Sequence, residues 1–184
     1  MDINTFLKSA KGEDVLNSDS TLEDVADSEV IQLVSFMLDE VEYGVDILSV
    51  HEILRYPEIT RLPNTPNFIK GVINLRGNVL PVVDVRLRFG FPRGKITDLT
   101  RIIVVETGGK QVGLLVDNVY QVVRIPVGSV DPPGELMIGV SEEFIAGIGR
   151  LKDRLIVLLN MSHVIFLEEK DMVKETSSFP SDNQ

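Results

Sequence analysis

Short apolar segments separated by turn-forming residues run through the middle of the chain, between residues 30 and 167. In several of them apolar and polar positions alternate with a period of two, which is typical of strands with one buried face. The segments are QLVSFML, EYGVDI, NVLPVVDV, RIIVVE, QVGLLVDNV and RLIVLLNM. Helical spacing is confined to short windows near 64–70, 86–90 and 141–145. The pattern therefore predicts a mainly β fold, and the paired glycines of TGGK predict a tight hairpin turn.

The apolar pattern occurs twice. A shift of 69 residues lays VSFMLDEVEYGVDILSV, from Val34, over IVVETGGKQVGLLVDNV, so that Gly44 meets Gly113. A shift of 76 residues lays FIKGVINLRGNVLPVVDV, from Phe68, over FIAGIGRLKDRLIVLLNM, from Phe144. Identities are few, so a chance match between β patterns is the alternative. The shared order of hairpin, strand, F-I-x-G, turn and strand favours a duplication.

Each copy suits a small barrel of about five strands, because closure removes exposed sheet edges. We expect two five-stranded barrels packed side by side with a groove between them, at residues 30–100 and 101–167, and exchange of strands between them is left open. Residues 1–29 hold eight acids against two bases, and residues 168–184 hold five against two. Both ends predict solvated, mostly disordered arms, although Ser20 and Glu23 could cap a short helix in the first.

Of the net charge of −10, these two ends carry −9, which leaves the centre of the chain almost neutral. A nucleic-acid partner is not expected, because no basic cluster is present to neutralise phosphates. The first residues lack the pattern of a signal peptide, and the longest strongly apolar run, 155–159, is too short to span a bilayer, so we expect a cytoplasmic protein with no direct membrane insertion.

Catalytic chemistry finds little support in the sequence. His51 and His163 are the two histidines, they lie in different copies, and neither has a metal-ligand spacing. Cysteine is absent, and no nucleophile elbow or phosphate-binding glycine loop occurs. We expect no catalytic residue, no cofactor and no metal site. A hydrolase that uses one of the histidines is the less favoured alternative.

Two surface features point instead to binding. Arg76 lies on the turn NLRGN, where it could pair with a carboxylate such as Glu52 or anchor a partner, and composition favours neither. Ile47, Val50 and Ile53 recur at a spacing of three, which could form an apolar stripe for a partner helix, although burial in a core is the commoner fate of such residues.

The segments FIKGVINLRGNVLPVVDVRLRFG, VGLLVDNVYQVVRI and FIAGIGRLKDRLIVLLNM closely resemble the CheW family, the coupling proteins of bacterial chemotaxis. The resemblance covers residues 30–167 and implies two small intertwined SH3-like barrels. It also implies a scaffold that binds the cytoplasmic tip of chemoreceptors and the regulatory domain of the histidine kinase CheA, in arrays at the inner face of the membrane. Receptor state would thereby control kinase autophosphorylation. A related pathway that drives pili or another output is the alternative.

The same resemblance assigns roles to individual positions. In the family the receptor tip, a helical hairpin, lies in the groove between the barrels. The residues that would line this groove here are Ile47, Val50, Ile53 and Val119. A second set matches positions associated with receptor or kinase coupling, and the division of this set between the two partners is left open: Glu52, Gly71, Asn74 and Arg76.

Overall fold

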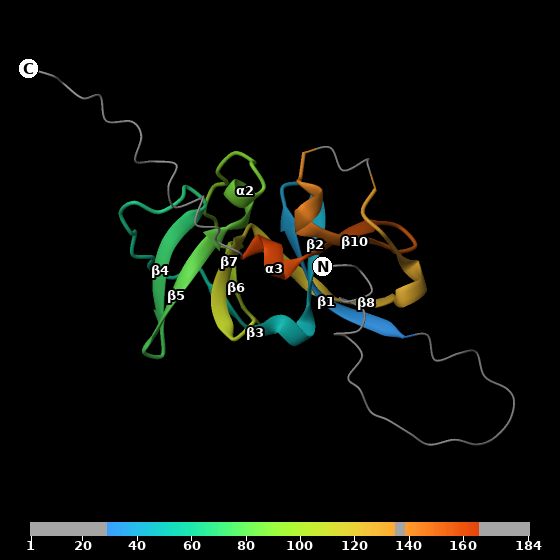
Figure 1. Ribbon diagram of the computed structural model, residues 1–184, viewed down its shortest axis with the longest axis horizontal. Helices are drawn as coiled ribbons and strands as arrows, with labels where there is room; N and C mark the ends of the chain where they lie inside the picture. The colour runs from blue at the N-terminus through green and yellow to red at the C-terminus, as the bar shows by residue number, and fades with distance from the viewer. Residues whose placement is uncertain (1–28, 135–138, 166–184) are drawn as a thin grey trace, which may run out of the picture.

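The computed structural model describes residues 29–134 and 139–165, which form two mixed β-sheets side by side (Figure 1). The six-stranded sheet has the order β8-β1-β2-β11-β10-β9, and the five-stranded sheet has the order β3-β6-β7-β5-β4. The predicted mainly β class is confirmed. The expectation of five strands in each barrel was wrong for one sheet, because the two-residue strand β9 (Val130–Asp131) is added to its edge.

The first half of the chain contributes β1 (Val30–Leu38), β2 (Val41–Asp46), β3 (Val50–Arg55), β4 (Ile69–Leu75) and β5 (Asn78–Asp84). The second half contributes β6 (Arg101–Thr107), β7 (Lys110–Val116), β8 (Asn118–Pro126), β9, β10 (Ile145–Arg150) and β11 (Leu155–Leu159). Four short helical turns lie between strands, and α3 follows β11: η1 (Ile47–Ser49), α2 (Val85–Arg88), η2 (Val127–Ser129), η3 (Glu142–Phe144) and α3 (Met161–Val164). The helical window near 86–90 matches α2 and that near 141–145 matches η3, whereas 64–70 forms turns and the start of β4.

The strand pairings repeat with the shifts seen in the sequence. Val82 lies opposite Gly113 in the parallel pair of β5 and β7, and Leu158 lies opposite Gly44 in the parallel pair of β11 and β2. The antiparallel pair of β4 and β5 and that of β10 and β11 change register at the same position of the repeat, after Ile69 in the first and after Ile145 in the second. Equivalent glycines and apolar residues therefore occupy equivalent places in the two sheets.

Each sheet nevertheless takes strands from both halves of the chain. The hairpin of β1 and β2 lies in the six-stranded sheet with β8 to β11, and the hairpin of β6 and β7 lies in the five-stranded sheet with β3 to β5. The division of the sequence into 30–100 and 101–167 therefore does not coincide with the division into sheets. The chain crosses between the sheets at two equivalent points, residues 46–50 and 116–118.

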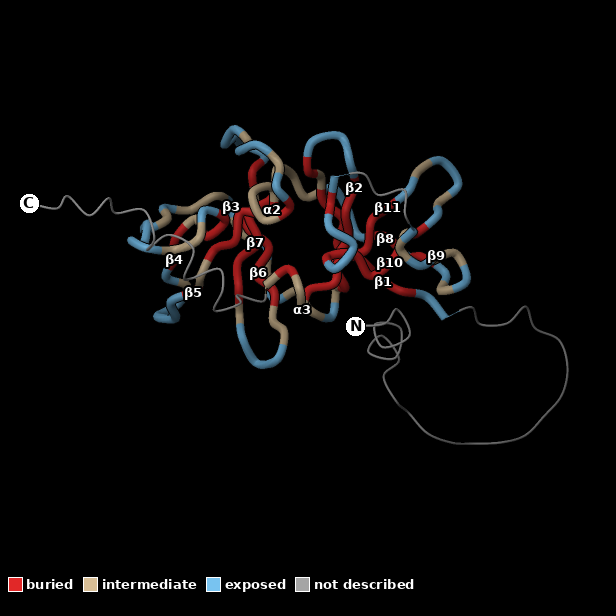
Figure 2. The backbone as a smooth tube through the Cα atoms, turned by 45° about the horizontal axis from the view of Figure 1, so that its top comes forward, coloured by how far each residue is buried: buried red, intermediate tan, exposed pale blue. Residues whose placement is uncertain are grey.

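Three apolar clusters hold the sheets together, and most of the strands are buried (Figure 2). Each sheet forms one subdomain, and each subdomain has an apolar cluster of its own. Leu33 and Ile156 belong to the cluster of the six-stranded sheet, and Val82 and Ile102 belong to the cluster of the five-stranded sheet. The largest cluster contains residues of both sheets. Because RIIVVE contributes alternate residues to two clusters, this strand is apolar on both faces.

Candidate functional site

Three of the four predicted groove residues lie at the two crossovers between the sheets. Ile47 begins η1 and Val50 begins β3 in the first crossover, and Val119 follows the second crossover at the start of β8. All three are half-buried and pack against the apolar cluster that the sheets share. Val50 and Val119 are equivalent under the 69-residue shift. Val50 pairs with Val105 and Val119 pairs with Phe36, which are themselves equivalent.

Ile53 lies apart from these three. Its side chain is 43% exposed, and it belongs to none of the three apolar clusters. The spacing of three residues suits a helix, but this segment is the edge strand β3, where side chains alternate between faces. The register of β3 also shifts at His51. Ile53 therefore shares the outer side of β3 with exposed neighbours, and a continuous helical stripe from Ile47 to Ile53 is not present.

Arg76 lies at the tip of the hairpin of β4 and β5. Arg76 and Gly77 have φ angles of 51° and 87°, as the two-residue turn that suits a twisted hairpin requires. The Asn74 side-chain oxygen accepts a hydrogen bond of 2.9 Å from the Gly77 N–H. Asn74 thereby fixes the turn that carries Arg76.

Glu52 and Arg76 form a bidentate ion pair. Arg76 Nη1 donates to Glu52 Oε1 at 2.8 Å, and Nη2 donates to Oε2 at 3.0 Å. The pair joins β3 to the turn after β4, the two edges of the five-stranded sheet. Pairing with a carboxylate, one of the two alternatives for Arg76, is thus present. The Arg76 side chain is still 76% exposed, so its outer face remains accessible to a partner.

Gly71 has a structural role that separates it from the other predicted positions. Its φ angle is 147°, and a Cβ at this position would lie 2.2 Å from the Thr60 carbonyl oxygen. That close approach allows Thr60 and Val72 to exchange two backbone hydrogen bonds of 2.9 and 2.8 Å. Glycine is therefore required here by the backbone, whatever partner binds nearby.

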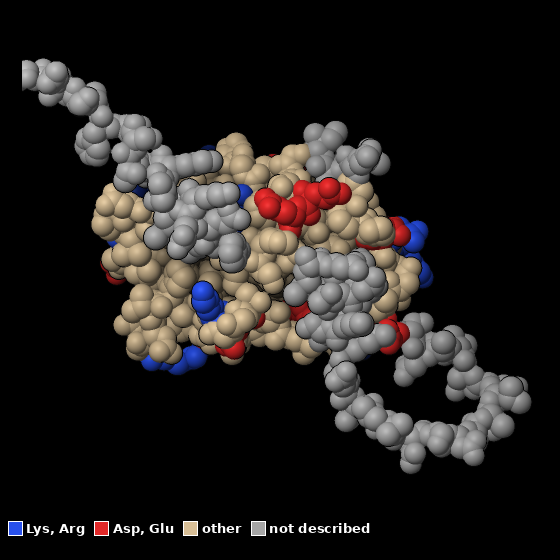
Figure 3. Space-filling model, in the orientation of Figure 1, with Lys and Arg blue, Asp and Glu red and all other residues tan. Residues whose placement is uncertain are grey.

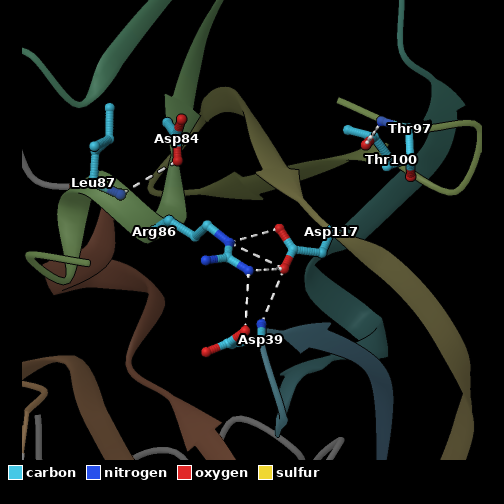
Figure 4. Close-up of polar contacts among 7 residues, drawn as sticks. All are labelled: Asp39, Asp84, Arg86, Leu87, Thr97, Thr100 and Asp117. Carbon is cyan, nitrogen blue, oxygen red and sulfur yellow. Dashed lines mark hydrogen bonds and ion pairs between the residues drawn. The ribbon is translucent and has the colours of Figure 1, made fainter. Parts of the chain in front are cut away.

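A partly buried ion-pair cluster, which sequence reasoning missed, lies beside the second crossover (Figure 4). The Arg86 guanidinium donates from Nε to Asp117 Oδ1 at 2.8 Å and also donates from Nη2 to Oδ2. Asp117 Oδ2 in addition accepts the Asp39 backbone N–H at 2.9 Å. Partial burial raises the pKa of the Asp117 carboxyl, but the hydrogen bonds from Arg86 and Asp39 outweigh it, so that pKa lies below its usual range.

The helix α2 that carries Arg86 begins at a buried acid. Asp84 accepts a hydrogen bond of 3.3 Å from the Leu87 N–H, and burial raises the pKa of the Asp84 carboxyl. Arg88, two residues after Arg86, donates to the His163 and Val164 carbonyl oxygens and lies over the Phe68 and Phe144 rings. The two arginines of α2 thus connect the two subdomains at separate points.

The histidines do not come together. His51 Nε2 lies 2.8 Å from Glu106 Oε2 at the surface, and His163 is half-buried in α3. Within residues 29–134 and 139–165, no group of three His, Cys, Asp or Glu side chains could hold a metal ion. In the same part of the chain no helix is long and apolar enough to cross a membrane.

Elsewhere on the surface, a groove of about 610 Å³ lies between β5, the hairpin of β6 and β7, and α3, and it contains none of the eight predicted site residues. On the face drawn in Figure 3, charged side chains form small separate groups within a mostly uncharged surface. No continuous basic stripe follows the described part of that face.

Comparisons with known proteins agree with the resemblance in the sequence. A family model described as the CheW-like domain matches residues 32–169. Chemotaxis protein CheW of Klebsiella aerogenes is 36% identical, covering 77% of this chain and 86% of that protein. Chemotaxis protein CheW of Helicobacter pylori is 35% identical, covering 74% and 82%. The crystal structure of the scaffolding protein TtCheW from Thermoanaerobacter tengcongensis is similar with a TM-score of 0.72 and 37% identity, covering 78% of this chain and 97% of that one.

Proposed function

Because the chain belongs to the CheW-like family, we propose that it is a non-catalytic cytoplasmic scaffold that couples chemoreceptors to the histidine kinase CheA. One partner is the helical tip of a chemoreceptor, and the other is the regulatory domain of CheA. By holding both in one array at the inner face of the membrane, the scaffold lets receptor state control kinase autophosphorylation.

The observation that carries the receptor-binding part is the convergence of Ile47, Val50 and Val119 on the two crossovers. Half-buried apolar side chains on two adjacent subdomains suit the apolar face of a helix, which presents residues at spacings of three and four. Arg76, held by Glu52, adds a planar charged group on a fixed turn, and arginine is enriched among residues that dominate binding energy. Ile53, exposed on the outer side of β3, offers a partner a separate apolar contact.

Gly71 and Asn74 support the same surface indirectly. Asn74 fixes the turn of Arg76. Gly71 lets the backbone of Thr60 pack closely against β4 at Val72. Substitutions at these two positions would therefore alter coupling through the hairpin and not through direct contact.

The receptor-binding part is tested with a soluble fragment of a chemoreceptor tip and isothermal titration calorimetry. We expect Val50→Asp to weaken binding at least tenfold, because it introduces a charge into an apolar contact. Val30→Asp is the matched control: it makes the same change at an exposed valine at the start of β1, outside the proposed surface, and its affinity should equal that of wild type. Arg76→Ala should weaken binding less than Val50→Asp. Unchanged affinity of a folded Val50→Asp, Arg76→Ala double variant contradicts the proposal.

The coupling part needs the kinase. Receptor-containing membranes, CheA and this chain are combined, and the rate of CheA autophosphorylation is measured with and without attractant. We expect the rate to depend on the attractant only when the chain is present. A rate that follows the attractant equally well without the chain contradicts the scaffold role.

A further inference from the structure

The backbone pairing that holds Val119 is short. The register of β8 against β1 shifts so that Ser35 pairs with Gln121 and Phe36 with Val119, which leaves no residue of β1 opposite Tyr120. On the other side of Val119 the ladder ends after one further pair, Met37 with Asn118. Two residue pairs therefore hold the segment between the register shift and the crossover.

The Asp117 side chain continues this ladder where the backbone pairing stops. Asp39 lies two residues beyond Met37, and its backbone N–H donates to Asp117 Oδ2 at 2.9 Å. The attachment depends on the carboxylate staying in place, because a side chain has rotational freedom that a backbone carbonyl lacks.

Arg86 holds that carboxylate from the other subdomain. Its guanidinium makes a bidentate contact with Asp117, and Nη2 also lies 3.7 Å from Asp39 Oδ1 (Figure 4). The fork of a guanidinium restricts both the position and the orientation of a carboxylate, which a point charge does not. Gly94 covers the group closely, since a Cβ there would lie 2.9 Å from Arg86 Nε. The Arg86 side chain is 17% exposed as a result.

We propose that Arg86 is a positioning residue for Val119: by fixing the Asp117 carboxylate, it sets where the start of β8 lies in the receptor-binding surface. This inference rests on the proposed function for the role of Val119. The equivalent residue Val50 is independent of Arg86, because its crossover is fixed by Asp46 within η1 and by the bond from the Val50 N–H to the Ile47 carbonyl.

Double-mutant cycles with the receptor-tip fragment test the inference. We expect Arg86→Met to weaken binding on the order of tenfold, a typical size for an indirect coupling. In the Arg86→Met background, Val119→Ala should cost little more, because its position is already lost, whereas Val50→Ala should cost as much as in wild type. A role in stability alone would lower all affinities through the folded fraction and leave both cycles additive. Additivity of Arg86→Met with Val119→Ala overturns the proposal.

Control variants separate the bidentate geometry of the Arg86 guanidinium from its positive charge. Arg86→Lys keeps the charge without the fork and should recover only part of the affinity. Arg150→Met removes an arginine from the exposed ion pair with Asp131, which lies within the six-stranded sheet, and should bind as wild type. Gly94→Ala keeps both partners and presses on the guanidinium, so it should reproduce the coupling with Val119 even if Arg86→Met folds poorly.

A second measurement does not depend on the receptor. Amide hydrogen exchange, followed by NMR, should be faster in Arg86→Met than in wild type at Asp39, Asn118 and Val119, and unchanged at Val50. If wild type fails to bind any receptor tip, the proposed function fails while this measurement still decides whether Arg86 positions the start of β8. Unchanged exchange at Asp39 and Val119 overturns the inference.

Discussion

The two crossovers between the sheets are equivalent in backbone but are anchored by different means. The first, residues 46–50, forms the turn η1, and Asp46 Oδ1 accepts the Leu48 N–H at 2.9 Å, two residues away. The second, residues 116–118, has no helical turn, and its Asp117 is tied to Arg86 and Asp39, which are 31 and 78 residues distant in sequence. One anchor is local and the other joins three separate segments.

This difference indicates which features of the repeat must recur in both copies and which can differ between them. The apolar positions and the register recur in both copies, since each sheet must bury equivalent faces. The polar anchor has no such requirement and needs only to satisfy the backbone groups that a crossover leaves unpaired. Two equivalent loops can therefore respond differently to substitution while the sheets around them stay alike.

The largest effect on stability is expected from the second crossover. Arg86→Met leaves the Asp117 carboxylate partly buried without its charged partner, and should lower the free energy of unfolding by about 2–3 kcal/mol, somewhat below the cost of breaking a fully buried pair. Chemical denaturation at pH 7 measures the change. Arg150→Met breaks an exposed ion pair and should cost less than about 1 kcal/mol. Equal losses in the two variants would mean that the partly buried cluster is no stronger an anchor than a surface pair.

A smaller effect is expected at the first crossover. Asp46→Ala removes the acceptor for the Leu48 N–H and should cost about 1 kcal/mol, as the loss of a capping side chain does. Asp46→Asn keeps an acceptor oxygen and should lose less than Asp46→Ala. If Asp46→Ala costs more than Arg86→Met, the local anchor is the stronger one, and the contrast between the crossovers is reversed.

The repeat was accessible from sequence because apolar positions and glycines determine strand register directly. Gly44 and Gly113, matched in the sequence, both lie where a Cβ would come within 3 Å of a side chain of the neighbouring antiparallel strand, Leu33 in one case and Ile102 in the other. The exchange of hairpins between the sheets was left open. A pattern of buried positions states which face is covered, but it does not state which strand lies alongside.

Among the polar groups, the local turn that carries Arg76 was predictable, whereas the ion pairs between distant segments were at most open alternatives. Arg76 was placed on a turn, and Glu52 was named as one candidate for its partner, because the turn itself was visible in NLRGN. Asp117 accepts the Asp39 N–H and pairs with Arg86, and neither contact leaves a periodic signal in the sequence. The helix expected near 64–70 was wrong, since Pro66 within this segment and Pro63 just before it favour turns over helix.

The smallest effect expected is in pH dependence, where the two crossovers should differ in sign. Partial burial raises the pKa of Asp117, but its hydrogen bonds lower that pKa by a larger amount, so the folded value lies below the unfolded one. Its stabilising contribution is thus complete above the unfolded pKa of about 3.9 and is lost as pH falls through the folded value. Burial raises the pKa of Asp46 by more than the hydrogen bond from the Leu48 N–H lowers it, so the folded pKa lies above the unfolded one. Ionised Asp46 therefore costs stability at neutral pH, and that cost disappears as pH falls through the raised value.

These signs can be measured against variants that do not titrate. The unfolding free energy of wild type minus that of Asp117→Asn should stay constant from pH 7 to about pH 5. It should then decrease toward pH 3, because the unfolded state binds the proton first. The unfolding free energy of wild type minus that of Asp46→Asn should increase as pH falls toward 4, because the folded state binds the proton first. Denaturant titrations at half-unit pH steps give both curves. Parallel curves would show that the carboxylates experience the same environment, and the distinction between a local anchor and a partly buried ion-pair anchor would then have no electrostatic basis.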